Sequence, residues 1–149
     1  MKKLIVTIAL TLSFAFFLSA QTKKPIAKTT PAKANTTNPA SIARGKMAYS
    51  QYCLSCHQPD GGGVTGLNPP LIKTEYVLGD KTRLINIILK GYNKGVEIDG
   101  EVYSNPMPPL NFLTDQQVAD VLTYVRNNFQ NKTSAITPML VKTVRASNK

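Results

Sequence analysis

The 149-residue sequence has no tryptophan, one histidine, two cysteines and five phenylalanines. With so few aromatic side chains, a domain of about 100 residues would be marginal on burial alone and could benefit from a large buried ligand. The cysteines and the histidine together make three side chains, one fewer than a tetrahedral structural zinc site requires. A single histidine also excludes bis-histidine ligation of a metal within one chain.

Acidic residues are absent from residues 21–40, and this absence explains most of the net charge of +10. Six lysines precede residue 41, whereas the remainder carries 12 Lys and Arg against 8 Asp and Glu. The basic excess therefore belongs to the N-terminal region rather than to a folded surface. Nucleic-acid binding requires a clustered basic face, usually with a recognisable motif. Neither is evident, so we expect no nucleic-acid partner.

The N-terminal 20 residues have the pattern of an export signal. Met1-Lys2-Lys3 is followed by an uncharged run over residues 4–18 and by Ser19-Ala20, a small-residue cleavage point. The alternative is a membrane anchor through residues 4–18, which as a helix would reach roughly 22 Å, short of the ~30 Å hydrocarbon core. We therefore predict a cleaved signal peptide over 1–20, a periplasmic location and no stable membrane insertion after cleavage.

Residues 21–40 are rich in Thr, Lys, Ala, Pro and Asn and have no apolar periodicity. Such a segment buries too little surface to offset its ordering entropy, so we predict a flexible linker. An attraction to an acidic partner or membrane surface is the alternative. We predict one folded domain over 41–131 and a C-terminal tail over 132–149, in which Thr137-Pro138 could start a short helix.

Within the predicted domain the sequence indicates helices and one turn. Residues 41–52 fit a helix, and Asp80 can cap a second one that ends near Gly91. Asp99-Gly100 is a turn signal between two short runs, 96–98 and 101–103, which could form a hairpin. Thr114 and Gln117 form a capping box that opens a third helix. An apolar stripe continues that helix: Val118, Val121, Leu122, Val125 and Phe129.

The strongest motif is Cys53-Leu54-Ser55-Cys56-His57. A Cys-x-x-Cys pair alone could be a disulfide, a redox pair or half of a zinc site. A disulfide does not need the histidine, and a thioredoxin-like pair would lie beside a βαβ pattern, which is missing. Two thiols that bond to a porphyrin edge, followed at once by an imidazole for the iron, meet the needs of a c-type haem. We predict one covalently bound haem c, held by Cys53 and Cys56 with His57 as an iron ligand.

A second iron ligand must come from elsewhere, and the four methionines are the candidates. Met1 leaves with the signal, Met47 precedes Cys53 on the same predicted helix, and Met139 lies beyond the third helix. Met107 lies in a proline-rich loop 50 residues after His57, far enough for the chain to reach the other haem face. We predict Met107 as the ligand; the alternative is that it only packs in a turn.

The second ring nitrogen of His57 needs a hydrogen-bond partner, because such bonds fix the orientation of a ligand. Proline carbonyls can accept this bond, and Pro69 or Pro70 is suitably placed in the sequence. The alternative is that both are ordinary loop prolines.

In the order of these parts, residues Ser41 to Asn131 resemble the class I cytochrome c family. The resemblance implies an all-α fold, with three to four helices around one haem and a small hairpin possible before the methionine loop. It also implies that the first and last domain helices cross where Gly45 and Tyr49 meet Val121 and Tyr124. Residues Gly79 to Arg126 look especially like bacterial periplasmic monohaem cytochromes. They are also similar to cytochrome domains of quinoprotein dehydrogenases, copper nitrite reductases and oxidases.

The resemblance implies a soluble, monomeric, periplasmic single-electron carrier rather than an enzyme. Its expected partners are redox proteins such as a dehydrogenase, a reductase or an oxidase. One alternative is a haem subunit of a larger complex of these classes. Another is a catalytic or gas-binding haem protein with an open sixth site, which is disfavoured because no second histidine is available for acid–base chemistry.

Overall fold

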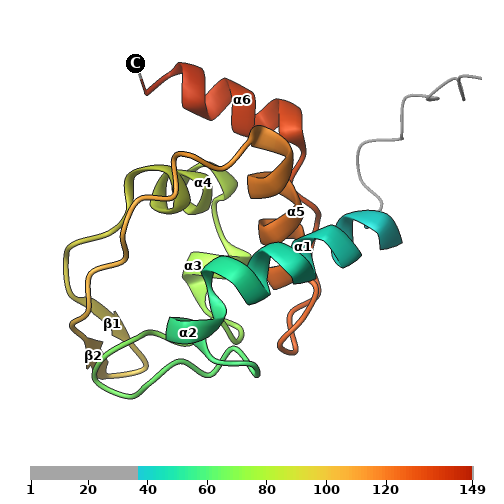
Figure 1. Ribbon diagram of the computed structural model, residues 1–149. Coiled ribbons are helices and arrows are strands. Elements are labelled where there is room, and N and C mark those ends of the chain that lie inside the picture. The colour runs from blue at the N-terminus through green and yellow to red at the C-terminus, as the bar shows by residue number, and fades with distance from the viewer. Residues whose placement is uncertain (1–36, 149) are drawn as a thin grey trace, which may run out of the picture. The chain divides into compact units, whose positions relative to one another are not determined.

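The computed structural model describes residues 37–148; the predicted signal peptide and most of the predicted linker lie outside them. The described part is mostly helical, with one two-stranded antiparallel hairpin (Figure 1). This confirms the predicted all-α fold with a small hairpin. In chain order the elements are α1 Pro39–Tyr52, α2 Leu54–His57, α3 Glu75–Leu78, α4 Lys81–Lys90, β1 Val96–Ile98, β2 Glu101–Tyr103, α5 Asp115–Val125 and α6 Pro138–Ala146.

Helix α1 begins two residues before the predicted start. The side chain of Asn38 accepts a hydrogen bond from the Ala40 amide and caps the helix, and Pro39 occupies the first helical position. Proline suits this position because its missing N–H would have no partner within the helix. The start is therefore set by Asn38, three residues before Ser41, where the predicted helix began.

Helices α1 and α5 cross in direct contact at Gly45. A Cβ at this position would lie 2.1 Å from the Asp120 carbonyl oxygen and 2.7 Å from the Tyr124 Cβ, so only glycine allows the approach. One turn later, the Tyr49 ring packs 5.5 Å from the Tyr124 ring and 5.1 Å from the Phe129 ring. The crossing brings the two ends of the cytochrome-like region together.

Helix α4 begins and ends at the predicted residues. The Asp80 carboxylate accepts a hydrogen bond from the Arg83 amide, and Gly91 follows the last turn with φ of 72°. The apolar face of α4 is buried: Leu84, Ile85, Ile88 and Leu89.

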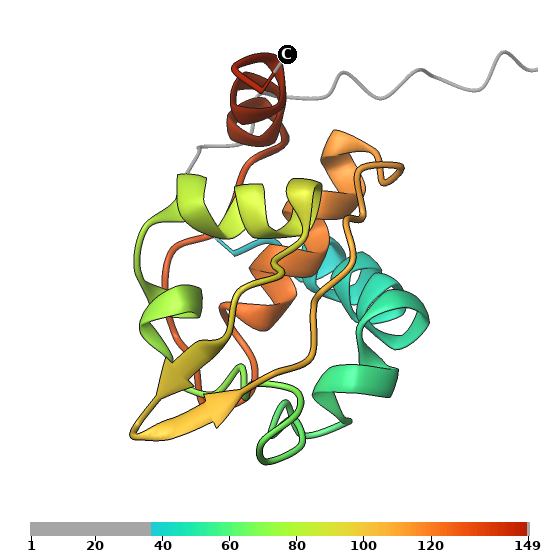
Figure 2. The same cartoon turned by 90° about the vertical axis from the view of Figure 1, so that its left-hand side faces the viewer.

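The hairpin forms at the predicted residues, with Val96 opposite Tyr103 and Ile98 opposite Glu101. Asp99 and Gly100 both have positive φ, 53° and 82°, the conformation that a tight two-residue turn requires. The chain after β2 then runs back past the end of α4 to α5 (Figure 2).

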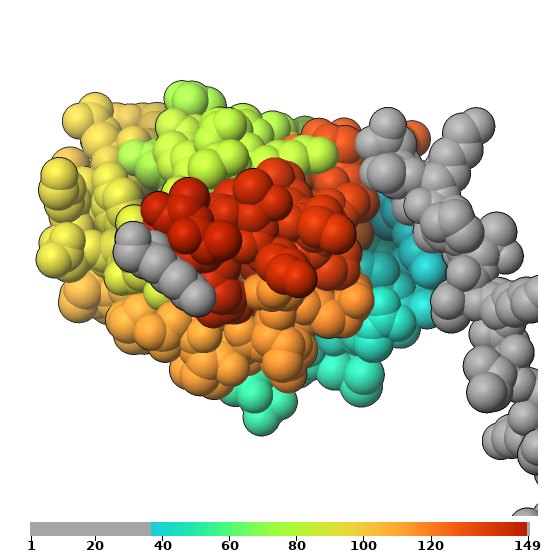
Figure 3. Space-filling view, turned by 90° about the horizontal axis from the view of Figure 1, so that it is seen from above, coloured from blue at the N-terminus to red at the C-terminus, as the bar shows by residue number. Residues whose placement is uncertain are grey.

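The capping box of Thr114 and Gln117 opens α5, whose residues Val118–Val125 are all buried. Beyond α5 the chain turns and forms α6, which packs on both α4 and α5 (Figure 3). Ile136, Val141 and Val144 are buried in this contact. Among the described helices, none has the length and apolar character needed to span a bilayer.

Candidate functional site

The two cysteines and the histidine lie together at helix α2. Cys53 is the residue before the helix, and Cys56 and His57 are its last two residues. Cys56 and His57 both donate backbone hydrogen bonds to the Cys53 carbonyl, so the five-residue motif closes one helical turn. Residues three apart on a helix share a face. The two thiols are free, Cys53 buried and Cys56 exposed, and both line the same cavity as His57.

His57 is oriented by the main chain of Pro69. Its Nδ1 lies 3.0 Å from the Pro69 carbonyl oxygen. Because a carbonyl can only accept, Nδ1 carries the proton and Nε2 keeps the lone pair that a metal ligand needs. Burial lowers the pKa of His57, partly opposed by this hydrogen bond, so the ring is neutral at neutral pH. Pro70, the other predicted candidate, lines the cavity but is not the acceptor.

The loop between His57 and Pro69 is folded tightly on itself. Gly63 has φ of 67°, and a Cβ there would lie 2.2 Å from the Asn68 carbonyl oxygen. The amide of Leu71 donates to the Gly61 carbonyl at 2.7 Å, and the Tyr49 hydroxyl donates to the Gln58 carbonyl at 2.6 Å. These bonds hold Pro69 beneath the imidazole.

Met107 lines the same cavity from the loop that follows the hairpin. Its main chain pairs with Tyr92 in both directions, at 2.7 Å from the Met107 amide and 2.8 Å from the Tyr92 amide. Gly91 makes this approach possible, since a Cβ there would lie 2.5 Å from the Met107 carbonyl oxygen. Methionine and histidine are thus presented to one space by separate segments of the chain.

A second set of bonds ties the methionine loop to the loop that follows the Cys-x-x-Cys-His motif. The Ser104 amide donates to the Gly66 carbonyl at 3.2 Å, and the Asn105 amide donates to the Leu67 carbonyl at 3.0 Å. The Asn105 side chain also contacts the Asn68 side-chain oxygen at 3.2 Å. The methionine loop is therefore held to the loop that follows His57.

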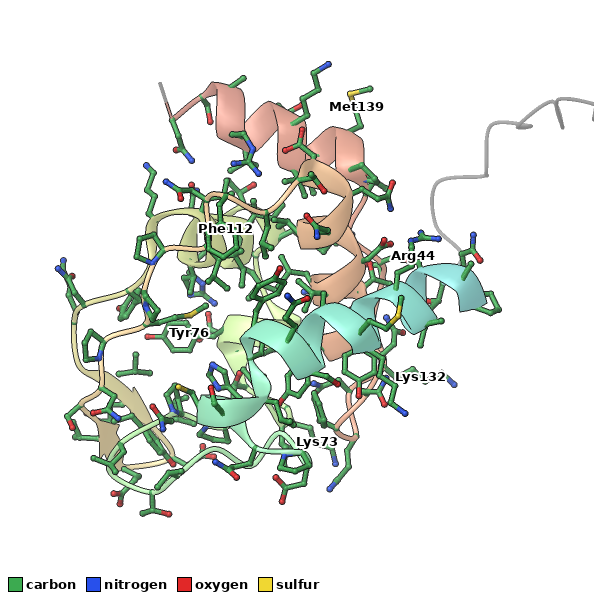
Figure 4. All side chains as sticks on the ribbon, viewed as in Figure 1. Arg44, Lys73, Tyr76, Phe112, Lys132 and Met139 are labelled. Atoms are coloured by element: carbon green, nitrogen blue, oxygen red, sulfur yellow. The ribbon has the colours of Figure 1, made fainter. Side chains whose placement is uncertain are left out.

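The cavity has a volume of about 250 Å³ and an apolar, aromatic wall. Its polar groups are neutral, and no charged side chain of residues 37–148 lines it. Tyr76 extends into it from α3 (Figure 4). Its ring packs edge-on against Tyr92, and the Arg83 guanidinium lies over it at 4.9 Å from the ring centroid. The remaining hydroxyl and amide groups come from Tyr52, Ser55, Asn68, Thr74, Tyr103 and Asn105.

Burial raises the pKa of the Cys53 thiol to about 11, with a smaller contribution from nearby Cys56. Cys53 is thus a neutral thiol at neutral pH and a weak nucleophile in the bare chain.

Comparison with known proteins decides the family. The family model for cytochrome c matches residues 42–129, which is more than half of the chain. The chain belongs to the cytochrome c family.

Relatives of this cytochrome include a cytochrome c-552 and cytochrome subunits of dehydrogenases. It is 33% identical over 87 residues to cytochrome c-552 of Thermus thermophilus, a match that covers 56% of this chain and 66% of that protein. It is also 33% identical over 109 residues to the cytochrome c subunit of the quinone alcohol dehydrogenase of Gluconacetobacter polyoxogenes, covering 64% of this chain. A third relative is the fructose dehydrogenase cytochrome subunit of Gluconobacter japonicus, 33% identical over 110 residues. This cytochrome spans only about a fifth of the length of those dehydrogenase subunits, 20% and 22% respectively.

Family membership means that this cytochrome carries covalently bound haem c and transfers electrons. The residues of the cavity fit that group. They provide two free thiols and an imidazole in one short segment, a thioether from a second segment, and an apolar lining with neutral polar groups.

Two residues that shape the site, Gly91 and Asn131, have roles that the sequence alone does not indicate. The sequence predicts Gly91 only as a helix end, whereas in the structure it also allows the close approach of the methionine loop. The Asn131 side chain joins three backbone groups, those of Leu71, Lys73 and Val125. These roles join positions far apart in the chain, so no local pattern could have indicated them.

Proposed function

We propose that this cytochrome is an exported single-electron carrier with one haem, bound through Cys53 and Cys56 and ligated by His57 and Met107. The observation that carries the proposal is that all four side chains line one cavity although Met107 is 50 residues from His57. The other methionines of the described residues support this choice, because Met47 is 66% exposed and Met139 is 70% exposed and points outward from α6 (Figure 4).

The haem supplies the one-electron couple of its iron, and the chain's residues set how that couple behaves. Pro69 keeps the His57 ring in one orientation and one tautomer. The pairing with Tyr92 restrains the main chain of Met107, which would keep rearrangement small when the iron changes its charge. A methionine ligand and a buried, apolar surrounding both favour a higher reduction potential.

If His57 and Met107 both ligate the iron as proposed, no position would remain on it for a substrate, which favours a carrier over an enzyme. The sequence also contains no second histidine that could act as a distal acid or base. We propose that the protein is periplasmic, monomeric and without stable membrane insertion, and that its partners are redox proteins.

The first test is the mature protein purified from a cell that attaches haem to exported proteins. Its mass should equal the polypeptide after removal of residues 1–20 plus one haem, bound in a form that resists acid–acetone extraction. The oxidised protein should show the charge-transfer absorption of methionine bound to ferric iron. A colourless protein with the mass of the bare polypeptide would disprove haem attachment.

The second test separates the methionines. Met107→Ala should abolish the methionine–iron absorption, lower the reduction potential and open the iron to carbon monoxide. Met47→Ala and Met139→Ala are the matched controls and should change none of these properties. If Met107→Ala keeps the native spectrum, the ligand is another residue.

A subunit role in a dehydrogenase is the second candidate, and it rests on the relatives that are cytochrome subunits of alcohol, fructose and gluconate dehydrogenases. Affinity purification of the tagged protein from its own cells should then recover a dehydrogenase in constant proportion. Recovery of the cytochrome alone, in a form that substrate-reduced dehydrogenase still reduces at a diffusional rate, would support the free carrier.

A further inference from the structure

The guanidinium of Arg145, near the end of α6, contacts the segment that follows the methionine loop. Its Nη1 donates to the Asn111 carbonyl at 2.9 Å, and its Nη2 donates to the Leu113 carbonyl at 2.7 Å. Its Nε pairs with the Asp115 carboxylate at 2.7 Å. One side chain thus binds three points along five residues, from the end of the loop to the first turn of α5.

Other contacts also restrain the methionine loop on this side: the Leu113 amide donates to the Leu110 carbonyl at 3.1 Å, Leu113 is buried, and the Phe112 ring packs edge-on against Tyr52. Met107 is held to Tyr92 and the Leu110 amide donates to the Ile88 carbonyl, after which the chain is exposed at Asn111 and Phe112. The prolines at 106, 108 and 109 have no amide N–H to donate, so the loop forms few backbone hydrogen bonds within itself. Arg145 therefore adds charge-assisted bonds from a separate helix to a segment that has few backbone hydrogen bonds of its own.

Helix α6, which carries Arg145, is packed firmly against the rest of the domain. Val141 and Val144 are fully or nearly buried against the core, at 0% and 4% exposure. The Asn148 side chain bonds to the Asn86 side chain of α4 at 2.7 Å. Before α6, the Lys81 ammonium donates to the Ala135 carbonyl at 2.9 Å. Figure 3 shows α6 lying between α4 and the segment that leads into α5.

Arg145 lies outside residues 42–129, the part of the chain that matches the cytochrome c family. We propose that Arg145 is a positioning residue. Its hydrogen bonds fix the end of the methionine loop to α6 and so keep Met107 on the iron. The proposal rests on the proposed ligation by Met107. It assigns a role in the redox site to a segment that the family match does not include.

The physical reason is the balance between a soft thioether ligand and competing ligands. Methionine stays bound only while the loop keeps the sulfur in place, and a loop with a loose end has more conformations in which the sulfur is away. Charge-assisted hydrogen bonds to two carbonyls remove those conformations, and they are stronger than bonds between neutral groups. Removing the guanidinium should therefore increase the fraction of open iron without changing either ligand.

The test uses the ferric holoprotein and imidazole as a competing ligand, followed by loss of the methionine–iron absorption. Arg145→Ala should raise the apparent affinity for imidazole at least about tenfold, the effect expected from losing one hydrogen bond to a charged group. Arg145→Lys should give an intermediate value, because one ammonium cannot reach all three acceptors. Lys142→Ala, which removes an exposed charge from the same helix, is the control and should match the wild type.

Hydrogen exchange gives a readout that does not depend on the ligand. In Arg145→Ala, peptides covering residues 104–113 should exchange faster, whereas α1 peptides should be unchanged. If Arg145→Ala does not accumulate as holoprotein, Arg145→Lys decides the matter by the same two measurements. If the Arg145 variants have the same imidazole affinity and the same hydrogen exchange as Lys142→Ala, the proposed role of Arg145 is wrong. A wild-type protein without the methionine–iron absorption would instead overturn the proposed ligation. Faster exchange at 104–113 in Arg145→Ala would in that case still show that Arg145 restrains the loop.

Discussion

Gly91 stands directly against the main chain of Met107, so that a Cβ at position 91 would lie 2.5 Å from the Met107 carbonyl oxygen. The same Cβ would lie 2.9 Å from the Pro109 nitrogen and 3.0 Å from the Pro108 carbonyl carbon. The residue that ends α4 thus also sets how closely the methionine loop approaches the cavity. Its φ of 72° adds a second requirement for glycine.

Gly91→Ala should push the methionine loop outward and strain the backbone. We expect the free energy of unfolding to fall by about 2–4 kcal/mol, from backbone strain and overpacking together, and the methionine–iron absorption to weaken. Denaturant titration and absorption spectra measure the two effects. Gly100→Ala is a matched control, because it has φ of 82° but no atom within 4 Å of the new Cβ. Equal losses in both variants would mean that the contact with Met107 contributes nothing.

Gly45→Ala should separate the crossing of α1 and α5. Glycine to alanine in a helix normally stabilises by up to about 1 kcal/mol. Here the added Cβ would meet the Asp120 carbonyl oxygen at 2.1 Å, so we expect a loss of about 3 kcal/mol or more. Thermal unfolding followed by circular dichroism measures it. Ser50→Ala, at an exposed position of the same helix, should leave stability nearly unchanged; a neutral Gly45→Ala would contradict the close crossing.

Asp120 is a buried carboxylate, with a side chain 3% exposed, that pairs with Arg44 at 2.6 Å and accepts bonds from Ser41 and Gln116. Asp120→Ala should cost about 2–4 kcal/mol, because it leaves donors without a partner and opens space beside α1. The control is Glu75, whose side chain is 84% exposed in its pair with Arg83. Glu75→Ala should cost less than about 1 kcal/mol. Denaturant titrations that rank the two variants equally would contradict this account.

Asn131→Ala should loosen the loop that follows Pro70. The Asn131 side chain donates to the Leu71 carbonyl at 2.8 Å and the Val125 carbonyl at 2.9 Å, and it accepts from the Lys73 amide at 2.8 Å. Three backbone groups would lose their partner, so we expect a loss of about 2–4 kcal/mol in unfolding free energy. Asn128→Ala, which removes one weaker bond to the Tyr124 carbonyl at 3.4 Å, should cost less than half as much.

Tyr124 should make stability fall at high pH. Burial raises the pKa of Tyr124 above its usual value. A raised folded-state pKa means that the folded protein holds the Tyr124 proton more tightly than the unfolded chain does. The stability that this proton contributes is therefore complete below about pH 10, the ordinary tyrosine pKa, and is lost as the pH rises through the folded-state pKa. Tyr124→Phe should therefore match the wild type at pH 7 and lose less stability between roughly pH 10 and 12. If the free energies of unfolding of the wild type and of Tyr124→Phe fell in parallel with pH, the raised pKa of Tyr124 would be contradicted.

Local rules in the sequence were sufficient for much of the fold. The hairpin follows from Asp99-Gly100, α4 from Asp80 and Gly91, and the start of α5 from Thr114 and Gln117, since each depends on a few neighbouring residues. The start of α1 was misplaced because Asn38, the true cap, lies within a segment read as linker. The short helices α2 and α3 were not predicted, since a single turn has too few residues for a periodic pattern.

The sequence by itself determined which chemistry the chain carries. The motif at residues 53–57 and the small inventory of methionines limited the cofactor and its candidate ligands before any fold was known. Only the tertiary structure decided between Pro69 and Pro70, placed Met107 beside Tyr92 and brought Arg145 to the end of the methionine loop. These are contacts between residues 12 to 34 positions apart, as for His57 with Pro69 and Arg145 with Asn111. Such contacts depend on how helices pack rather than on neighbouring residues, and local sequence patterns carry no record of them.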